Sequence, residues 1–424
     1  MEQNSPKLLI AEMAKAGRDA QRLLAQMNDA AKAAALRLAA QALRDSAQAI
    51  LTANREDCEA AGAADLSPAM IDRLRLDEGR LAGIASTVEA VADLPDPVGN
   101  VIDSSERPNG LALSRVRVPI GLIGIIYESR PNVTADAAAL CIRAGNAVLL
   151  RGGSEAVHSN RAIYAAMAAG LEAGGIPAKA VQLLPTQDRE AVGAMLKANG
   201  ADGAGQIDMV IPRGGRALVE RVQADARVPV LAHLDGICHT YIHASADPGM
   251  ARAVAVDAKM RRTGICGAME TLLIDATFAD SQNLVAALID TGCELRGDLR
   301  AMALDSRIAA ATDADWGTEY LDAILSVGIV DGMEDALAHI ARHSSGHTEA
   351  IVTSDAAAEE VFLTSVDSAI VMANASTQFA DGGEFGLGAE IGIATGRLHA
   401  RGPVALEGLT TYKWQVRGSG QVRG

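Results

Sequence analysis

The sequence predicts an α/β protein in which parallel sheets are covered by helices on both faces. Three observations support this fold class. Short apolar segments alternate with longer amphipathic segments over most of the chain, and the connections between them are short. The chain also has 424 residues, which exceeds the usual size of one hydrophobic core. We therefore expect two α/β domains, with a boundary near residue 230.

The first 95 residues are predicted to be helical. They are rich in Ala, Leu, Arg, Glu and Gln, and apolar residues recur every three or four positions from Pro6 to Ala53 and from Ala69 to Val91. The pattern breaks between Asp96 and Val118, where the turn-forming run Ser104–Gly110 separates two short alternating segments. This segment is predicted to be a β-hairpin.

Strands and helices then alternate, as in a parallel sheet. Buried strands are expected at Gly121–Tyr127, Ala147–Arg151, Ala180–Leu184 and Ile207–Ile211. The helices between them are expected at Thr134–Arg143, Ser154–Ala173, Asp188–Asn199 and Gly215–Ala226. Gly145 and Gly174 stand where two of these helices should end, as C′ glycines commonly do.

A second α/β section is expected from about Pro229 to Ala400. Its first helix is predicted at Ala246–Arg261, and the Gly-rich tail carries a predicted exposed strand around Thr410–Val416. The strand candidates of this section are Met269–Asp275, Ile324–Val330, Ala350–Thr353 and Ala369–Met372.

Composition excludes several classes of function. The net charge of −15 and a pI near 5.0 argue against nucleic acid as a partner, because phosphate binding needs a basic surface. No segment approaches the roughly 20 apolar residues of a membrane span, and no signal peptide is recognisable. The five cysteines are scattered and lack CxxC spacing, so neither a disulfide framework nor a zinc site is expected. We expect a cytoplasmic protein with reduced thiols.

The sharpest local motif surrounds Cys266. Gly264 and Gly267 bracket the cysteine on a loop after a predicted helix, where the backbone can approach a ligand closely. The nearby cations Lys259 and Arg262 favour a thiolate, which is the nucleophilic form of cysteine. The alternative is a buried structural cysteine, which is the commoner fate of a single Cys.

Two turns resemble anion sites. Arg151, Gly152, Gly153 and Ser154 follow one predicted strand, and the run Arg213–Gly215 follows another. The N–H groups at a helix N-terminus bind anions, and glycine lets a phosphate reach the backbone. Tight turns with a surface arginine remain the alternative for each turn alone. Because two such turns occur at strand ends of one sheet, we favour a nucleotide as the ligand.

Asn132 follows the first buried strand and has two interpretations. Its side chain could cap the helix that starts there. Its amide could instead donate to an oxyanion at the carboxyl edge of the sheet. The histidines give no metal pattern of the HExxH kind, and His233, His239 and His243 do not share one helix face, so no metal site is predicted.

Taken together, these segments resemble the γ-glutamyl phosphate reductase family of the aldehyde dehydrogenase superfamily. The resemblance covers roughly residues 100 to 414 in several motifs in the family's order. The matching segments are Val118–Asn132, His233–His239, Gly264–Leu273, Asp315–Leu321, Met372–Thr377 and His399–Val404.

The resemblance implies a fold of three parts. A Rossmann-like cofactor domain would comprise residues 1–95 and 119–230, and an α/β catalytic domain residues 231–398. A β-flap for oligomerisation would comprise residues 96–118 and 399–424, so a homo-oligomer is expected. Exposed strand edges of this kind invite pairing between subunits.

The resemblance also implies the site and its chemistry. Cys266 falls at the nucleophile position and Asn132 at the oxyanion-hole amide. The cofactor, expected to be NADPH, would be held by residues at three places. These are Arg151, Gly152, Gly153 and Ser154 at the adenosine ribose, Arg213, Gly214 and Gly215 at the pyrophosphate, and Glu319 at the nicotinamide ribose.

The expected reaction is the reduction of L-glutamyl 5-phosphate to L-glutamate 5-semialdehyde in proline biosynthesis, with Arg130, Lys259 and Arg262 gripping the substrate. A separate glutamate kinase would supply the acyl phosphate. The family usually has Pro, Asn, Lys and Arg where this chain has Thr263, Gly267, Gly328 and Gln378. A related aldehyde dehydrogenase with a different acyl substrate therefore stays open as the alternative.

Overall fold

The computed structural model describes residues 5–200 and 206–423 and divides the chain into two compact units. The first unit consists of Met1–Ala232, Leu387–Gly392 and Val404–Gly424, and the second of His233–Gly386 and Ile393–Pro403. The division after Ala232 lies close to the boundary predicted near residue 230. The C-terminal part contributes to both units, so the second unit does not correspond to a single continuous span.

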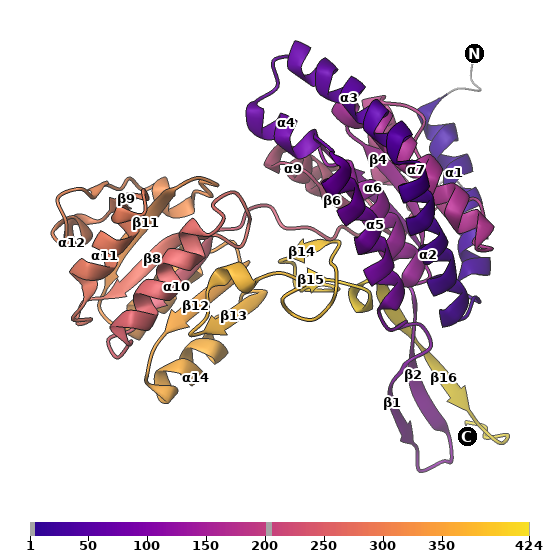
Figure 1. The fold of residues 1–424 in the computed structure, drawn as a ribbon. Coiled ribbons are helices and arrows are strands. Elements are labelled where there is room, and N and C mark those ends of the chain that lie inside the picture. Colours follow the sequence, from indigo (N-terminus) through magenta and orange to yellow (C-terminus); the bar gives the residue numbers. More distant parts are fainter. Residues whose placement is uncertain (1–4, 201–205, 424) are drawn as a thin grey trace. The chain divides into compact units, whose positions relative to one another are not determined.

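A four-stranded parallel sheet forms the centre of the first unit (Figure 1). Its strand order is β5-β4-β3-β6, and every residue of the central strand β3 is buried. A continuous apolar run of this kind is typical of a strand covered on both faces. The four strands are β3 (Leu122–Tyr127), β4 (Ala147–Gly152), β5 (Val181–Leu183) and β6 (Met209–Arg213), which confirms the predicted positions to within two residues.

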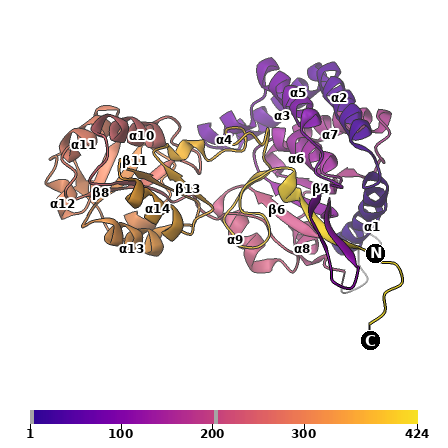
Figure 2. The same cartoon turned by 90° about the horizontal axis from the view of Figure 1, so that it is seen from below.

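Helices cover both faces of this sheet (Figure 2). Helices α1, α8 and α9 pack on one face through an apolar cluster that includes Ile10, Met195 and Val222. Helices α6 and α7 cover the other face, and α2, α3 and α5 pack against these two. The helices are α1 (Pro6–Leu24), α2 (Asp29–Asp45), α3 (Ala47–Ala63), α4 (Pro68–Leu74), α5 (Glu78–Asp93), α6 (Asn132–Arg143), α7 (Val157–Ala173), α8 (Arg189–Lys197) and α9 (Arg216–Asp225), and a 3-10 turn at Ser154–Ala156 precedes α7.

Local capping interrupts the long helical pattern predicted at the N-terminus. Asn28 accepts a hydrogen bond from the Ala31 N–H at 2.9 Å, so a new helix begins there. The C′ prediction is confirmed for Gly145, which has a φ of +75°, and is wrong for Gly174, which has a φ of −84°. Gly175, with a φ of +83°, takes the left-handed position instead because α7 extends to Ala173.

The predicted hairpin and tail strand belong to one antiparallel sheet, in the order β1-β2-β16. These strands are β1 (Val101–Glu106), β2 (Ala112–Pro119) and β16 (Thr410–Arg417). Every residue of β1 is exposed, and the guanidinium of Arg115 lies 5.1 Å from the Tyr412 ring and 5.6 Å from the Trp414 ring. The sheet is part of the first unit, and its role in oligomerisation stays a prediction.

A seven-stranded parallel sheet forms the centre of the second unit, in the order β10-β9-β11-β8-β7-β12-β13. The strands are β7 (Cys238–Ile242), β8 (Met269–Asp275), β9 (Glu294–Gly297), β10 (Ala309–Ala310), β11 (Ile324–Val330), β12 (Thr348–Val352) and β13 (Ile370–Ala373). The helices around it are α10 (Pro248–Met260), α11 (Ser281–Asp290), α12 (Leu299–Met302), α13 (Met333–His343) and α14 (Ala356–Ser365). Strands β8 and β11 match their predicted spans residue for residue.

Short elements complete the chain. A two-stranded pair joins β14 (Gly392–Ala394) to β15 (Gly402–Val404). Single 3-10 turns lie at Asp315–Gly317, Thr377–Phe379 and Glu407–Leu409. None of the helices in the described part of the chain combines the length and apolar character that crossing a membrane requires.

Candidate active site

Three loops meet at the carboxyl edge of the first unit's sheet. They follow the parallel neighbours β3, β4 and β6, and they contain the three motifs that the sequence singled out in this region. The chain continues from β3 to β4 and β5 on one side and returns to β6 on the other. The crevice outside such a switch point is where ligands of open α/β sheets bind. The three motifs therefore lie at one edge of the sheet, and their binding roles stay predictions.

Glu155 ties the loop after β4 to the loop after β3. Its Oε1 accepts hydrogen bonds from the Ser129 N–H and, at 2.9 Å, from the Ser129 Oγ. Ser129 has a φ of +42°, a left-handed conformation that is uncommon for a residue with a side chain. The two hydrogen bonds offset the cost of this conformation. Glu155 is adjacent to Ser154 in the predicted anion turn, but no local sequence pattern distinguishes it from a surface glutamate.

Glu128 ties the same loop to the turn after β6. Its Oε2 accepts a hydrogen bond from the Gly215 N–H at 3.0 Å, at the start of α9. A Cβ atom at Gly214 would lie 2.4 Å from this oxygen, so the Glu128 side chain would have to move to accommodate a larger residue there. A carboxylate oxygen thus lies at the N-terminus of α9, at the turn that is predicted to bind pyrophosphate.

A cavity of about 330 Å³ lies beside these loops, and cations from three elements line it. Arg151 comes from β4, Arg189 from the start of α8 and Arg221 from α9. The Arg151 Nη2 donates to the Gln187 carbonyl at 3.2 Å, while its buried Nε has no hydrogen-bond partner among the described residues. Gly153 and Ser154 line the same cavity. Glu128 and Glu155 also line the cavity, and Arg221 forms an ion pair with Asp225 at 3.6 Å. The three guanidinium groups outnumber the two carboxylates, so the cavity can accept a phosphorylated ribose.

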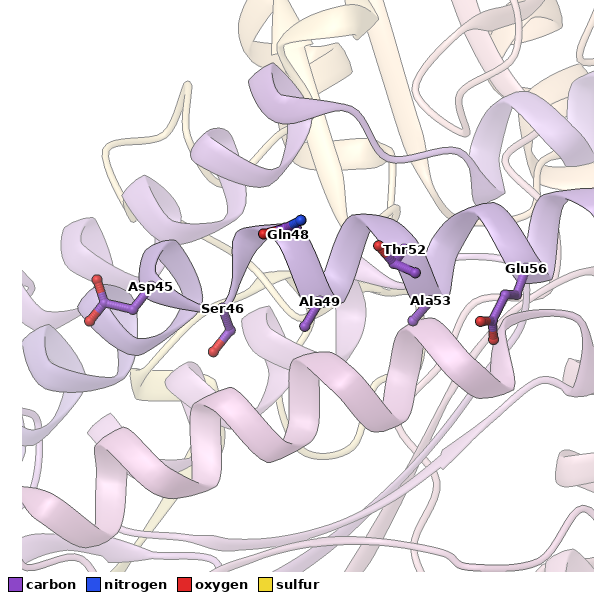
Figure 3. Close-up of a pocket in the computed structure, with 7 residues that line it drawn as sticks. All are labelled: Asp45, Ser46, Gln48, Ala49, Thr52, Ala53 and Glu56. Atoms are coloured by element: carbon purple, nitrogen blue, oxygen red, sulfur yellow. The ribbon is translucent and has the colours of Figure 1, made fainter.

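The sequence analysis missed Arg189 and Arg221. Each lies on an amphipathic helix without a local motif, and only the packing of α8 beside α9 brings them to the cavity. A second hollow, along α3, is a poor alternative for a nucleotide (Figure 3). Its described lining residues include the carboxylates of Asp45 and Glu56 and no cation, which disfavours phosphate.

Asn132 is the first residue of α6, and its side chain does not cap that helix. Its Nδ2 donates to Oδ2 of Asp136, one turn further on, at 2.8 Å. Burial raises the pKa of Asp136 to about 6, while the Asn132 hydrogen bond and the charge of Arg213 lower it. The capping interpretation is therefore wrong, and Asp136 orients the amide.

In the second unit, the loop between α10 and β8 carries Cys266, whose side chain is partly exposed. The backbone of Gly236 packs against it so closely that a Cβ atom there would lie 2.2 Å from the Cys266 carbonyl oxygen and 2.7 Å from its Cα. The Cys238 thiol donates to the same carbonyl at 3.1 Å. These contacts fix the backbone of Cys266 while leaving the side chain accessible.

Lys259 does not occupy a position from which it could grip a substrate. Its side chain is fully buried, and its Nζ donates to Oε2 of Glu270, also buried, at 2.6 Å. Burial raises the pKa of Glu270, and the charge of Lys259 opposes that shift. The pair joins α10 to β8 on either side of the Cys266 loop, so the prediction that Lys259 contacts substrate is corrected to a structural role.

Other predicted residues of the second unit gather around this loop. Oε1 of Glu319 accepts a hydrogen bond from the Gly236 N–H at 2.9 Å. Gln378 is buried, and its Nε2 donates to the carbonyls of Ala258 at 2.9 Å and Arg262 at 3.1 Å. Gln378, one of the four departures from the family pattern, therefore ties the end of α10 in place. The Arg262 side chain is exposed, and that of Arg130, in the first unit, is partly exposed.

The surroundings of Gly267 and Gly328 show how much space the side chains usual in the family would have. A Cβ atom at Gly267 would lie 3.1 Å from the Thr377 carbonyl oxygen, so the Asn usual in the family would need that segment to shift. A Cβ atom at Gly328 would lie 3.3 Å from Leu273 and 3.5 Å from Trp316. Trp316 therefore fills the side of β11 where the family's lysine would start. The structure offers no explanation for Thr263.

Comparisons with known proteins agree with this geometry. A family model described as "Aldehyde dehydrogenase family" matches residues 3–298. Proteins named gamma-glutamyl phosphate reductase from Novosphingobium aromaticivorans and Sphingopyxis alaskensis are 69% and 68% identical to this chain over 415 residues, which are 98% of this chain and 96% of each relative.

The fold agrees as well. The crystal structure of gamma-glutamyl phosphate reductase from Thermotoga maritima has a TM-score of 0.94 and 41% identity, and the match covers 98% of this chain and 100% of that one. The fold shared with this superfamily implies a nicotinamide cofactor. The chain thus belongs to the aldehyde dehydrogenase family and, within it, to the gamma-glutamyl phosphate reductases, which are oxidoreductases.

Proposed function

We propose that this protein reduces L-glutamyl 5-phosphate to L-glutamate 5-semialdehyde and phosphate with NADPH, through a thioester on Cys266. The observation that carries the proposal is the Cys266 loop. It presents a partly exposed thiol on a backbone held by Gly236 and Cys238, in a chain whose relatives are named for this reaction. We assign the reaction to proline biosynthesis because its expected product is L-glutamate 5-semialdehyde.

The chemistry follows from a thiolate beside an acyl phosphate. The Cys266 thiolate attacks the carbonyl carbon, the carbon–oxygen bond to phosphate breaks, and phosphate leaves with the electron pair. The Cys266 N–H stabilises the charge on the tetrahedral oxygen, and the family resemblance assigns the second donor to the Asn132 amide. Each such donor contributes about 2.7–4 kcal/mol to the transition state.

Reduction completes the cycle. A nicotinamide cofactor, when bound, would supply the hydride that reduces the thioester carbon. The thiohemiacetal that remains on Cys266 then releases the aldehyde as its carbon–sulfur bond breaks, and the thiol is restored. The residue at the position of the water-activating Glu of hydrolytic relatives belongs to the run Ala232–Gly236, which contains no Glu. A reductase that exchanges phosphate needs no hydrolytic water.

The cavity in the first unit supports NADPH. Arg151, Gly152, Gly153 and Ser154 would hold the adenosine ribose, and Arg189 and Arg221 would add positive charge for a 2′-phosphate. Arg213, Gly214 and Gly215 would hold the pyrophosphate at α9, where Glu128 now accepts the Gly215 N–H. Glu319 would contact the nicotinamide ribose.

The substrate's anionic groups need cations that can reach them. Arg130 and Arg262 remain our candidates, because they are not fully buried, whereas Lys259 is buried in an ion pair. A separate glutamate kinase would supply the labile acyl phosphate. The exposed sheet of β1, β2 and β16 would join subunits in a homo-oligomer.

The reverse reaction tests the proposal directly. Glutamate 5-semialdehyde, NADP⁺ and inorganic phosphate are mixed with wild type, with Cys266→Ser, and with Cys58→Ser as a control on the other partly exposed cysteine. We expect NADP⁺ reduction that requires phosphate and is lost only in Cys266→Ser. Reduction without phosphate would favour a hydrolytic dehydrogenase with another acyl substrate, and full activity of Cys266→Ser would refute the covalent mechanism.

A further inference from the structure

Two histidines from separate segments of the second unit lie beside Cys266. His233 precedes β7 and His347 immediately precedes β12, and one ligand atom from each lies within 4.8 Å of the other and of the Cys266 Sγ. The two imidazole rings are 5.1 Å apart between centroids and meet edge to face. The sequence predicted no metal site, because residues so far apart along the chain form no recognisable ligand spacing.

The hydrogen bonds of both histidines define which nitrogen can bind a ligand. The Nδ1 of His233 lies 2.7 Å from the Ile393 carbonyl, so Nδ1 carries a proton and Nε2 is the ring nitrogen that could bind a metal ion. The Nδ1 of His347 lies 2.8 Å from the Thr348 Oγ1. The Nε2 of His347 is fully buried and has no hydrogen-bond partner among the described residues.

We propose that Cys266, His233 and His347 form a site for a borderline-soft divalent transition metal, with Zn²⁺ as the representative ion. A thiolate and two neutral imidazoles are the ligands that zinc prefers, and three protein ligands leave a fourth position for water. Metal-binding histidines normally donate their other ring N–H to a carbonyl or another acceptor. His233 shows that arrangement, and the Thr348 hydroxyl can serve His347 in the same way.

Binding requires a small closure of the cluster. With Zn–S and Zn–N bonds of about 2.3 and 2.0 Å, tetrahedral ligand atoms are about 3.3–3.6 Å apart. The atoms here lie within 4.8 Å of one another, so an adjustment of about 1 Å is needed. The partly exposed side chain of Cys266, between Gly264 and Gly267, can supply it by rotation about χ1.

The consequence is reversible inhibition. A bound metal takes the Cys266 thiolate as a ligand, the thiol proton goes to solvent, and the sulfur can no longer attack an acyl carbon or an alkylating reagent. Metal affinity therefore increases with pH. This effect on turnover depends on the proposed function, whereas binding itself depends only on the three side chains.

The first test measures binding without substrate or cofactor. Chelator-treated full-length protein is titrated with Zn²⁺ by calorimetry, and Co²⁺ is added separately to look for thiolate-to-cobalt charge-transfer absorption. The variants are Cys266→Ser, His233→Gln and His347→Gln, with His158→Gln on α7 in the first unit as the matched control. We expect one ion per chain in wild type and in His158→Gln. Each ligand variant should weaken Zn²⁺ binding by more than roughly 100-fold. Loss of a group that only hydrogen-bonds to a ligand typically weakens metal binding by about 10–100-fold.

The second test measures protection of the thiol. Zn²⁺ should slow iodoacetamide labelling of Cys266, located by peptide mapping, and leave labelling of Cys58 unchanged. Equal Zn²⁺ affinity in wild type and Cys266→Ser, or Co²⁺ binding without a thiolate band, would overturn the proposal. If His347→Gln does not fold, the Zn²⁺ affinity of His233→Gln and the cobalt spectrum of wild type still test the proposed site. Zinc binding by a chain that fails the phosphate-dependent assay would support this site while refuting the proposed function.

Discussion

The Asn132 side-chain amide donates a hydrogen bond to Oδ2 of Asp136 at 2.8 Å, within the first turn of α6. Because both residues lie on one helix, the amide is oriented by a neighbour that moves with it. The other carboxylate oxygen of Asp136 is buried and has no hydrogen-bond partner among the described residues. The fold therefore retains an acid in an unfavourable environment, and this acid orients the amide that the family resemblance assigns to the oxyanion.

The replacement Asp136→Asn should stabilise the protein at neutral pH, and Asp136→Leu, which removes the acceptor of the Asn132 amide, should reduce activity. Burial raises the pKa of Asp136 to about 6, above its ordinary value of 3.8, so the folded protein retains a proton that the unfolded chain loses. The stability of wild type therefore decreases as pH rises from about 4 to 6, and Asp136→Asn does not share this decrease. Between pH 5 and 7 the stability difference should shift by about 1 kcal/mol in favour of Asp136→Asn.

Thermal unfolding at pH 5 and pH 7 measures this shift, with Asp19→Asn on the surface of α1 as the control. Turnover should decrease by roughly 10–100-fold in Asp136→Leu, because the Asn132 amide loses its acceptor. It should decrease less in Asp136→Asn, whose side-chain amide oxygen can still accept this hydrogen bond. An unchanged stability difference across this pH range would show that Asp136 is ionised and solvated. Unchanged turnover in Asp136→Leu would show that the orientation of Asn132 is set by other groups.

Gly236→Ala should inactivate the enzyme without unfolding it. The new Cβ would lie 2.2 Å from the Cys266 carbonyl oxygen, so the nucleophile loop must move. A displacement of about 1 Å in a catalytic group costs on the order of 100-fold in rate. Gly317→Ala is the matched control, because a Cβ atom there has no neighbour within 4 Å. Turnover, circular dichroism and the rate of Cys266 alkylation would be compared; wild-type turnover in Gly236→Ala would mean that the loop adapts at no cost.

The sequence predicted the first unit's sheet and the loops at its edge because buried parallel strands are continuous apolar runs. Cys266 and the Arg–Gly turns were predictable for a related reason, since glycine marks places where a backbone approaches a ligand. Pairs formed by packing were not predictable. Lys259 was misassigned because a lysine near a reactive cysteine has the same local sequence whether it faces solvent or a buried Glu270.

Strands β9 and β10 were missed for a different reason. The segment Glu294–Gly297 alternates charged with small or apolar residues, and the two residues of β10 are exposed. Neither carries the apolar run that predicts a buried strand. His347 was not singled out because its relation to Cys266 depends on the order of β7, β8 and β12 in the sheet, which places segments distant in sequence side by side.

Removing one partner of the Lys259–Glu270 pair should lower the free energy of unfolding strongly, whereas replacing both partners with apolar residues should lower it little. Lys259→Met leaves Glu270 buried without its counter-ion, and breaking a buried pair in this way costs about 3–5 kcal/mol. The double variant Lys259→Met/Glu270→Leu removes both charges and should recover most of that loss. Lys15→Met removes an exposed partner of Asp19 and should cost less than about 1 kcal/mol. Urea unfolding provides the three values, and a double variant no more stable than the single one would contradict the argument.

Arg189 and Arg221 should determine the preference for NADPH over NADH. Both line the cavity that also includes Arg151, and they come from two different helices, α8 and α9. A 2′-phosphate would accept charge-assisted hydrogen bonds from these guanidinium groups, each contributing about 1.5–3 kcal/mol. Arg189→Ala and Arg221→Ala should each weaken NADPH binding by roughly 10-fold or more and leave NADH binding nearly unchanged.

Calorimetric binding of both cofactors, without substrate, measures this preference independently of turnover. Arg161→Ala is the matched control, because Arg161 is an exposed arginine of the same unit that does not line the cavity. The long-range attraction of any cation for a polyanion would weaken NADPH binding in all three variants to a similar, salt-dependent extent. A direct contact instead predicts a loss confined to Arg189→Ala and Arg221→Ala that persists at high salt. Equal losses for NADPH and NADH would place these arginines near the pyrophosphate rather than near the 2′-phosphate.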